Sequence, residues 1–139
     1  DGVLPEFDLD EAVRTASFVA SSVQKLSLKA VHDIGEGGLA VALAEMAIRS
    51  GIGAKLNDYD NHISMFNESG GRVLVVVGNN DLDDFLEAAS AEEVTAKVIG
   101  QTGGSLLEFG PTVEISVDAL MAASQSQLPD ALGQGTVSA

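Results

Sequence analysis

The sequence predicts a mixed α/β (α+β) fold in which a layered, mixed β-sheet is covered by helices. Three observations support this fold class. Apolar residues recur at spacings of three and four between Leu9 and Leu28, which is typical of a helix. The segment Arg72–Val77 is an apolar run of strand-forming residues after its first position. Segments of helical and extended character alternate along much of the chain.

Length and composition fit a single domain. The chain has 139 residues, of which 45% are hydrophobic, and this is enough to bury one core. We assign residues 1–127 to this domain and residues 128–139 to a flexible C-terminal tail. The chain begins at Asp1 without a Met, as a cut fragment would.

The first helix is expected from Leu9 to Leu28. Asp8 precedes it as an N-cap, and Glu11 follows three positions later as the acid of a capping box. The face that we expect to be buried consists of Leu9, Ala12, Val13, Ala16, Val19, Val23 and Leu26.

A strand, a glycine-rich turn and a helix should follow. Ala30–Ile34 is a short extended stretch, and Gly35–Gly38 supplies the turn. Leu39–Ile48 returns to helical composition, and Ser50 with Gly51 should end that helix because Gly favours the left-handed C-cap conformation.

The middle of the chain should hold two strands and an acidic helix. Ala54–Leu56 is expected to be a short strand, and Asn57–His62 a turn or loop. Arg72–Val77 lacks polar alternation, which predicts a central strand covered on both faces. The helix Leu82–Ala89 should be capped by one of residues 79–81.

The last third should contain two strands and a helix. Val94–Ile99 and Ser105–Phe109 are predicted strands, joined by a turn at Gly100–Gly104. The final helix should run from about Val117 to Ser124, with Ser116 as its cap.

Charge excludes one class of partner and limits another. The 21 acidic and seven basic residues give a net charge of −14, which repels a nucleic-acid backbone. The same field repels a bare nucleotide phosphate. Any phosphate bound here therefore needs a divalent cation or Lys and Arg side chains from another segment.

Other features of the composition favour a reducing compartment and do not predict a membrane span. The absence of cysteine excludes disulfides and thiolate metal sites, so we expect the cytoplasm. No stretch of about 18 apolar residues predicts a membrane span, and the first residues do not resemble a signal peptide.

The glycine turn is the first candidate site. Glycines before a helix let a ligand approach the unsatisfied amides of its first turn, which favour an anion. Asp33 and Glu36 stand beside those amides, so we expect a phosphate bound through Mg²⁺ with Asp33 as the metal ligand. The alternative is a structural turn that needs glycines and is capped by one of these acids.

The two histidines are also considered as site residues on the basis of their positions. His32 could be a base or a metal ligand, although a single His at a strand end is more often a structural residue. His62 lies in a polar segment, where we expect it to be exposed to solvent.

The second candidate segment is Phe66–Arg72. Its paired glycines before a strand suggest close backbone approach, and Glu68 and Arg72 could form an ion pair. A bulge or turn stabilised by that pair is the alternative interpretation.

These two segments resemble the phosphoribosylformylglycinamidine synthase family. Residues 30–47 are similar to its signature A-x-H-D-x-S-[DE]-G-G-L-x-x-A-L-A-E, and residues 66–77 to its segment F-S-E-S-x-x-R-x-L-V. The resemblance covers nearly the whole chain. It implies a domain like the C-terminal domain of aminoimidazole ribonucleotide (AIR) synthase. Gly35 and Asn67 depart from it, because the family usually has Ser at the first position and Ser or Gly at the second.

The resemblance implies an ATP-dependent C–N ligase of purine biosynthesis. Such an enzyme converts formylglycinamide ribonucleotide, ATP and glutamine-derived ammonia into the amidine, ADP, phosphate and glutamate. It uses ATP and Mg²⁺, and Asp33 would contact both metal and nucleotide. The other expected nucleotide-binding residues are Gly35, Gly37 and Gly38, and further candidates are His32, Glu36, Glu68 and Arg72.

The resemblance also implies partners. These are the amino-terminal portion of the same enzyme and a glutaminase subunit that supplies ammonia. A second copy of the chain, in a homodimer, is a further candidate partner. We expect the isolated chain to be inactive, because the other catalytic residues of the family lie upstream. Two alternatives stay open: a non-catalytic, nucleotide-stabilised structural module, or a domain of another ATP-using enzyme of the AIR synthase superfamily.

Overall fold

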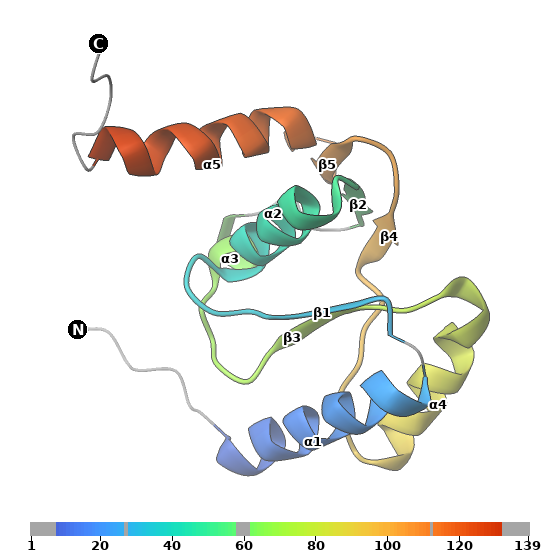
Figure 1. The fold of residues 1–139 in the computed structure, drawn as a ribbon. Coiled ribbons are helices and arrows are strands. Elements are labelled where there is room, and N and C mark those ends of the chain that lie inside the picture. Colours follow the sequence, from blue (N-terminus) through green and yellow to red (C-terminus); the bar gives the residue numbers. More distant parts are fainter. Residues whose placement is uncertain (1–7, 27, 58–61, 112, 132–139) are drawn as a thin grey trace. The chain divides into compact units, whose positions relative to one another are not determined.

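The computed structural model describes residues 8–26, 28–57, 62–111 and 113–131, and it confirms the mixed α/β class (Figure 1). Helices and short strands are interleaved along the chain. In order, the elements are α1 (Leu9–Lys25), β1 (Ala30–Asp33), α2 (Gly38–Ser50), β2 (Ala54–Leu56), α3 (His62–Phe66), β3 (Val73–Val76), η1 (Asn79–Asp81), α4 (Leu82–Ala91), β4 (Gly100–Thr102), β5 (Leu106–Phe109), β6 (Val113–Ser116) and α5 (Val117–Ala131).

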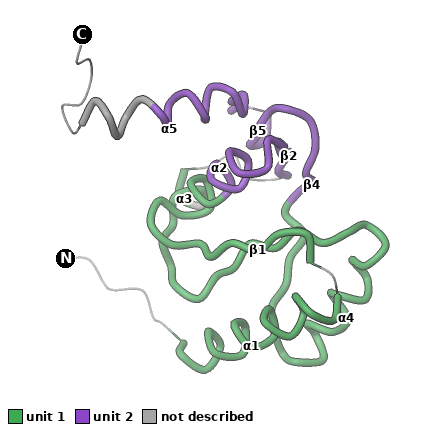
Figure 2. Tube along the Cα trace, in the orientation of Figure 1, with its two compact units in different colours: residues 1–42, 61–99 green, residues 43–60, 100–139 purple. Residues whose placement is uncertain are grey.

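The chain divides into two compact units (Figure 2). Unit 1 comprises Asp1–Ala42 and Asn61–Ile99, and unit 2 comprises Leu43–Asp60 and Gly100–Ala139. Each unit holds its own β-sheet among the described residues, so the prediction of one sheet is wrong. The division of the sequence at residue 127 into a domain and a tail stays a prediction.

The sheet of unit 1 is a two-stranded antiparallel pair. β1 pairs with β3 from Ala30 opposite Val76 to Asp33 opposite Val73. β3 was correctly predicted as a strand, but within the described residues it has one neighbour and is not central. An unbroken apolar run indicates that both faces of a strand are covered, but it does not give the number of its partners.

The core of unit 1 lies around α1 and α4. Phe18, Phe85, Ala89 and Val94 form its buried cluster. The rings of Phe18 and Phe85 have centroids 5.2 Å apart at an angle of 56°, a favourable tilted arrangement.

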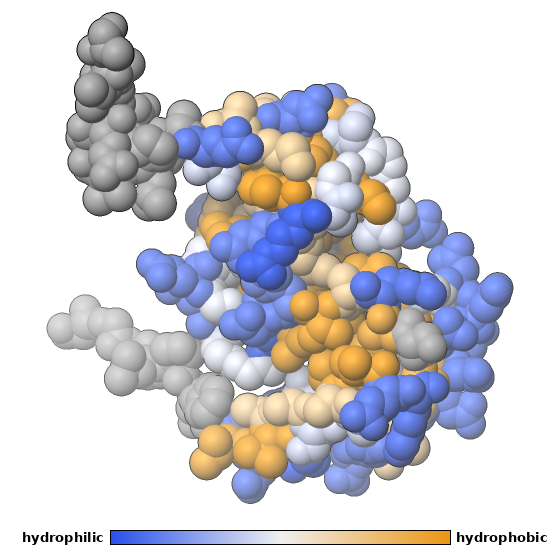
Figure 3. All heavy atoms as spheres, in the orientation of Figure 1, coloured by the Kyte–Doolittle hydropathy of each residue, from blue (hydrophilic) through white to orange (hydrophobic). Residues whose placement is uncertain are grey.

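The predicted buried face of α1 is largely wrong. Phe18 and Ser22 are its buried residues, whereas Leu9, Val13 and Val23 are 64%, 56% and 49% exposed. Apolar side chains therefore remain on the surface along α1 (Figure 3). The predicted N-cap is confirmed, because the amide of Glu11 donates to Asp8 Oδ1 at 3.0 Å.

The predicted strand Val94–Ile99 is also wrong. Glu93 adopts a left-handed conformation (φ 56°), and the amide of Val94 donates to the carbonyl of Ala89 at 2.9 Å, which closes α4. Val94 then enters the core, and residues 95–98 are exposed. The alternation of apolar and polar residues in this segment is therefore not accompanied by a strand. The prediction of α4 itself is confirmed.

Unit 2 contains a four-stranded sheet in the order β4-β2-β5-β6. β2 is parallel to β5 and antiparallel to β4, and β6 completes the other edge. Gly100–Thr102, predicted as part of a turn, is the strand β4. A Cβ at Gly100 would lie 2.2 Å from the carbonyl oxygen of Lys55, so glycine permits this close approach. β6 was not predicted.

The remaining predictions of local structure are mostly confirmed. β2 and β5 form as expected, and Gly51 ends α2 with φ 70°. The amide of Ala119 donates to Ser116 Oγ at 3.1 Å, which confirms that cap of α5. α5 continues to Ala131, so residues 128–131 are helical, and residues 132–139 lie outside the described residues.

The segment predicted as a loop at residues 57–62 has a mixed outcome. Residues 58–61 lie outside the described residues, and His62 begins the short helix α3, which was not predicted. Within the described part of the chain, no helix is both long and apolar enough to cross a membrane.

Candidate functional site

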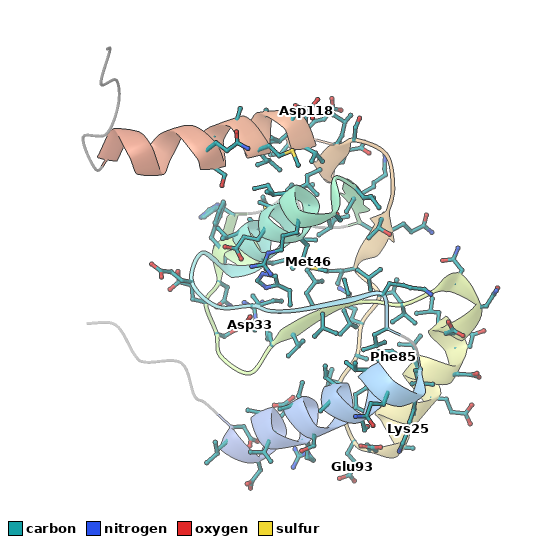
Figure 4. The ribbon with its side chains drawn as sticks, in the orientation of Figure 1. Lys25, Asp33, Met46, Phe85, Glu93 and Asp118 are labelled. Carbon is teal, nitrogen blue, oxygen red and sulfur yellow. The ribbon has the colours of Figure 1, made fainter. Side chains whose placement is uncertain are left out.

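β1 carries Asp33 to the start of the glycine turn. The pairing of Asp33 with Val73 ends the β1–β3 ladder, and the amide of Ile34 then donates to the carbonyl of Arg72 at 2.9 Å. The side chain of Asp33 is 92% exposed, and it is labelled beside β1 in Figure 4. Within unit 1, its carboxylate is therefore accessible to a ligand.

His32 has a structural contact. Its side chain is 14% exposed, and its Nδ1 lies 2.6 Å from the carbonyl oxygen of Asp33. Because a carbonyl oxygen only accepts, Nδ1 carries the proton in this hydrogen bond. The same nitrogen is 3.7 Å from Asp33 Oδ1. This geometry favours the structural interpretation of His32 over a role as base or metal ligand.

Gly37 and Gly38 are required by the geometry of the turn. Both have positive φ, at 76° and 66°. A Cβ on Gly37 would lie 2.3 Å from Cγ2 of Val41, and a Cβ on Gly38 would lie 2.8 Å from the carbonyl oxygen of Met65. Gly38 thus lets the start of α2 contact the backbone of residues 65–67.

Gly35 has no such restriction. A Cβ added to Gly35 would have Asp33 Oδ2 as its nearest contact beyond the adjacent residues, at an ordinary van der Waals distance of 3.8 Å. The space at this position therefore accommodates a Cβ, which the serine usually found here in the resembled family would add. The two glycine positions 37 and 38 do not accommodate a side chain in the same way.

Glu68 joins the two motifs. The amide of Gly37 donates to Glu68 Oε1 at 2.8 Å, across 31 residues of sequence. The amide of Gly38 donates to the carbonyl of Gly35 at 3.0 Å. Two amides that were expected to face a phosphate therefore donate to acceptors within the chain.

Arg72 organises the loop that carries Glu68. Its Nε donates to the carbonyl of Ser69 at 3.2 Å, and a terminal nitrogen donates to the carbonyl of Asn67. The ion pair suggested for Glu68 and Arg72 is not what the structure shows, because the two side chains have these separate partners.

Asn67 is a residue whose role the sequence analysis missed. Its Oδ1 accepts from the amide of Ser69 at 2.9 Å, which closes the loop before Arg72. The signal was available, because an Asn side chain often bonds to the backbone two residues later.

The acids around the turn do not form a complete metal site. Glu36 is exposed, and no group of three or more His, Cys, Asp or Glu side chains in the described part of the chain could hold a metal ion. A separate hollow of about 250 Å³ is lined by the N-cap and first turn of α1 and by the 69–72 loop, namely Asp8, Glu11, Ala12, Ser69, Gly70, Gly71 and Arg72. Asp33 does not line it.

Comparison with known proteins identifies relatives. Residues 11–106 match the family model described as AIR synthase related protein, C-terminal domain. The chain is 36% identical over 136 residues to phosphoribosylformylglycinamidine synthase subunit PurL of Rhizobium meliloti, which is 96% of this chain and 18% of that protein. It is 37% identical over 131 residues to the same subunit of Rhodospirillum rubrum, at 93% and 18% coverage. The chain thus spans less than a fifth of these relatives' length.

Solved structures show the same fold. Thermotoga maritima PurL complexed with ATP superposes with a TM-score of 0.74 at 18% identity, over 87% of this chain and 23% of that chain. The same protein complexed with FGAR gives a TM-score of 0.69 at 18% identity, over 83% and 21%. Since the family model covers more than half of the sequence, the chain belongs to the AIR synthase-related protein family, through its C-terminal domain.

Proposed function

We propose that this chain is the C-terminal domain of a phosphoribosylformylglycinamidine synthase and contributes Asp33 to a Mg²⁺–nucleotide site. The main supporting observation is the exposed carboxylate of Asp33 at the start of the glycine turn. Glu68 of the second family motif accepts a hydrogen bond from Gly37 in this turn, which belongs to the first motif. The PurL relatives, at 36% and 37% identity, support the same assignment.

The reaction would be the ATP-dependent amidation of formylglycinamide ribonucleotide. ATP phosphorylates the amide oxygen and leaves as ADP, and ammonia then displaces that oxygen as phosphate to form the amidine. The enzyme is accordingly an amidoligase, and we place it in the cytoplasm. The chain spans 18% of its relatives' length, so the complete activity requires the rest of the protein.

Asp33 fits the usual coordination of Mg²⁺. Protein-bound Mg²⁺ commonly uses one or two carboxylates together with substrate phosphates and water. Asp33 supplies one exposed carboxylate, and the described residues provide no three-ligand cluster around it. The remaining ligands would come from nucleotide, water and the amino-terminal portion of the enzyme. Mg²⁺ would supply charge neutralisation between Asp33 and the phosphates.

The three glycines have different roles in this proposal. Gly35 has no side chain to shield its backbone amide, so any contact that it makes with a nucleotide would be through that amide. Gly37 and Gly38 shape the turn that follows Asp33. His32 supports Asp33 through the carbonyl contact, and Glu36 stays exposed beside the turn.

The proposed partners complete the site and the supply of ammonia. The amino-terminal portion would provide the other catalytic groups, and a glutaminase subunit would provide ammonia. A homodimer is compatible with this assembly. The charge of −14 is consistent with a domain that binds phosphate only with Mg²⁺ and with basic groups from a neighbour.

Asp33→Asn in the complete enzyme tests the proposal. Loss of a metal-ligating charge should weaken the affinity for ADP in the presence of Mg²⁺ by about 10- to 100-fold, measured by isothermal titration calorimetry. Asp10→Asn is the matched control, because it removes the charge of an exposed acid on α1. Equal affinity of both variants and the wild type would remove Asp33 from the nucleotide site.

A second candidate is a structural module that a bound nucleotide stabilises without reacting. The observation that favours it is the self-contained turn, in which Gly37 and Gly38 donate to acceptors within the chain. Under this hypothesis, Mg²⁺ and ADP raise the melting temperature of the complete enzyme, and Asp33→Asn removes that rise without changing the rate of amidation.

A further inference from the structure

We infer that Glu68 is a positioning residue, which holds the turn at residues 34–38 through the Gly37 amide and does not bind nucleotide phosphate. The inference rests on the proposed function, because the turn matters through Asp33 beside it. It assigns a role to a side chain that the family resemblance alone marks only as a possible nucleotide contact.

The carboxylate of Glu68 accepts a hydrogen bond just before the start of α2. Glu68 Oε1 lies 2.8 Å from the amide nitrogen of Gly37, immediately before α2. Amides at a helix start carry a partial positive charge, so a carboxylate there is favourable. A phosphate oxygen at this amide would have to displace Glu68 and would then lie beside its negative charge. Glu68 therefore excludes phosphate from this donor.

The loop that carries Glu68 is itself held by hydrogen bonds. The guanidinium of Arg72 donates to the carbonyls of Ser69 and Asn67, and the amide of Ser69 donates to Asn67 Oδ1 at 2.9 Å. These bonds fix the backbone on both sides of Glu68. A long, exposed side chain loses less entropy in one hydrogen bond when its backbone is already ordered.

The turn at residues 34–38 is held at both ends. At its start, the amide of Ile34 donates to the carbonyl of Arg72 at 2.9 Å. At its end, Gly38 contacts the backbone of residues 65–67. The bond from Gly37 to Glu68 lies between these contacts, so it limits the movement of the turn next to Asp33.

The test compares Glu68→Ala with Glu68→Gln in the complete polypeptide. Gln keeps an oxygen that accepts from Gly37, and Ala does not. Hydrogen exchange of the peptide covering residues 34–39, followed by mass spectrometry, reports the turn without nucleotide. Calorimetry with ADP and Mg²⁺ reports the site. Glu87→Ala, which removes an exposed carboxylate of α4, is the control.

We expect Glu68→Ala to speed exchange of the turn by about fivefold and to weaken ADP binding, whereas Glu68→Gln stays within about twofold of wild type in both measurements. Unchanged exchange in Glu68→Ala would overturn the inference. So would a Glu68→Gln variant that loses affinity while its turn stays protected, since Glu68 would then contact metal or nucleotide directly.

Failure of the proposed function gives a different result. If Asp33→Asn binds ADP as tightly as the wild type while Glu68→Ala still speeds exchange, the assignment of Asp33 is wrong and the positioning of the turn by Glu68 stands. The two claims therefore have separate readouts.

Discussion

At the scale of single residues, the predictions that succeeded depend on neighbours in sequence. Asp8 and Ser116 cap their helices as expected, because an N-cap bonds to an amide three residues away. The bond between Glu68 and Gly37 crosses 31 residues, and no local pattern predicts it. Glu68 and Arg72 are spaced as an ion pair across a turn would require, but each side chain bonds to a backbone group instead.

The glycine turn yields a prediction at this scale. Gly38→Ala should destabilise the domain by about 1–3 kcal/mol, because a Cβ would meet the backbone of Met65 at 2.8 Å and φ is 66°. Gly35→Ser should change the free energy of unfolding by about 0.5 kcal/mol or less, since its Cβ has open space. Denaturant unfolding of both variants measures the difference. Equal stability of the two would mean that the turn adopts another conformation.

At the scale of elements, helical periodicity located α1 but misjudged which face is buried. The helix has apolar residues on more than one side, and the large ring of Phe18 packs against Phe85 while Leu9 and Val13 remain exposed. The spacing of apolar residues alone does not identify the buried face, because that depends on which apolar side chains of other elements pack against the helix. Helix α3 was missed because it has only five residues, too few for a periodic signal.

The two faces of α1 predict different costs of substitution. Phe18→Ala should lower the free energy of unfolding by about 3–5 kcal/mol, because it removes a ring from the core of unit 1. Val13→Ser, on the exposed face of the same helix, should change it by about 0.5 kcal/mol or less. Thermal and denaturant unfolding provide the comparison. A cost at Val13 that matches the cost at Phe18 would show that the exposed face is covered in the folded protein.

At the scale of the whole molecule, the fold class was predictable and the division into two units was not. Alternating helices and strands indicate an α/β chain, but unit 1 is built from two separate stretches of sequence, and so is unit 2. Strand β2 pairs with β5, about fifty residues later in the chain. Strand β4 is short and contains a glycine, so its sequence gives little sign that it pairs with β2. The candidate site was predictable as two motifs, but the bond that joins them was not.

The measurement that tests the central claim most directly is anomalous diffraction from crystals of the complete enzyme grown with ADP and Mn²⁺ in place of Mg²⁺. We expect a metal peak about 2.0–2.5 Å from a carboxylate oxygen of Asp33 and from a phosphate oxygen of the nucleotide. A nucleotide whose metal lies elsewhere, with Asp33 contacting only water, would contradict it.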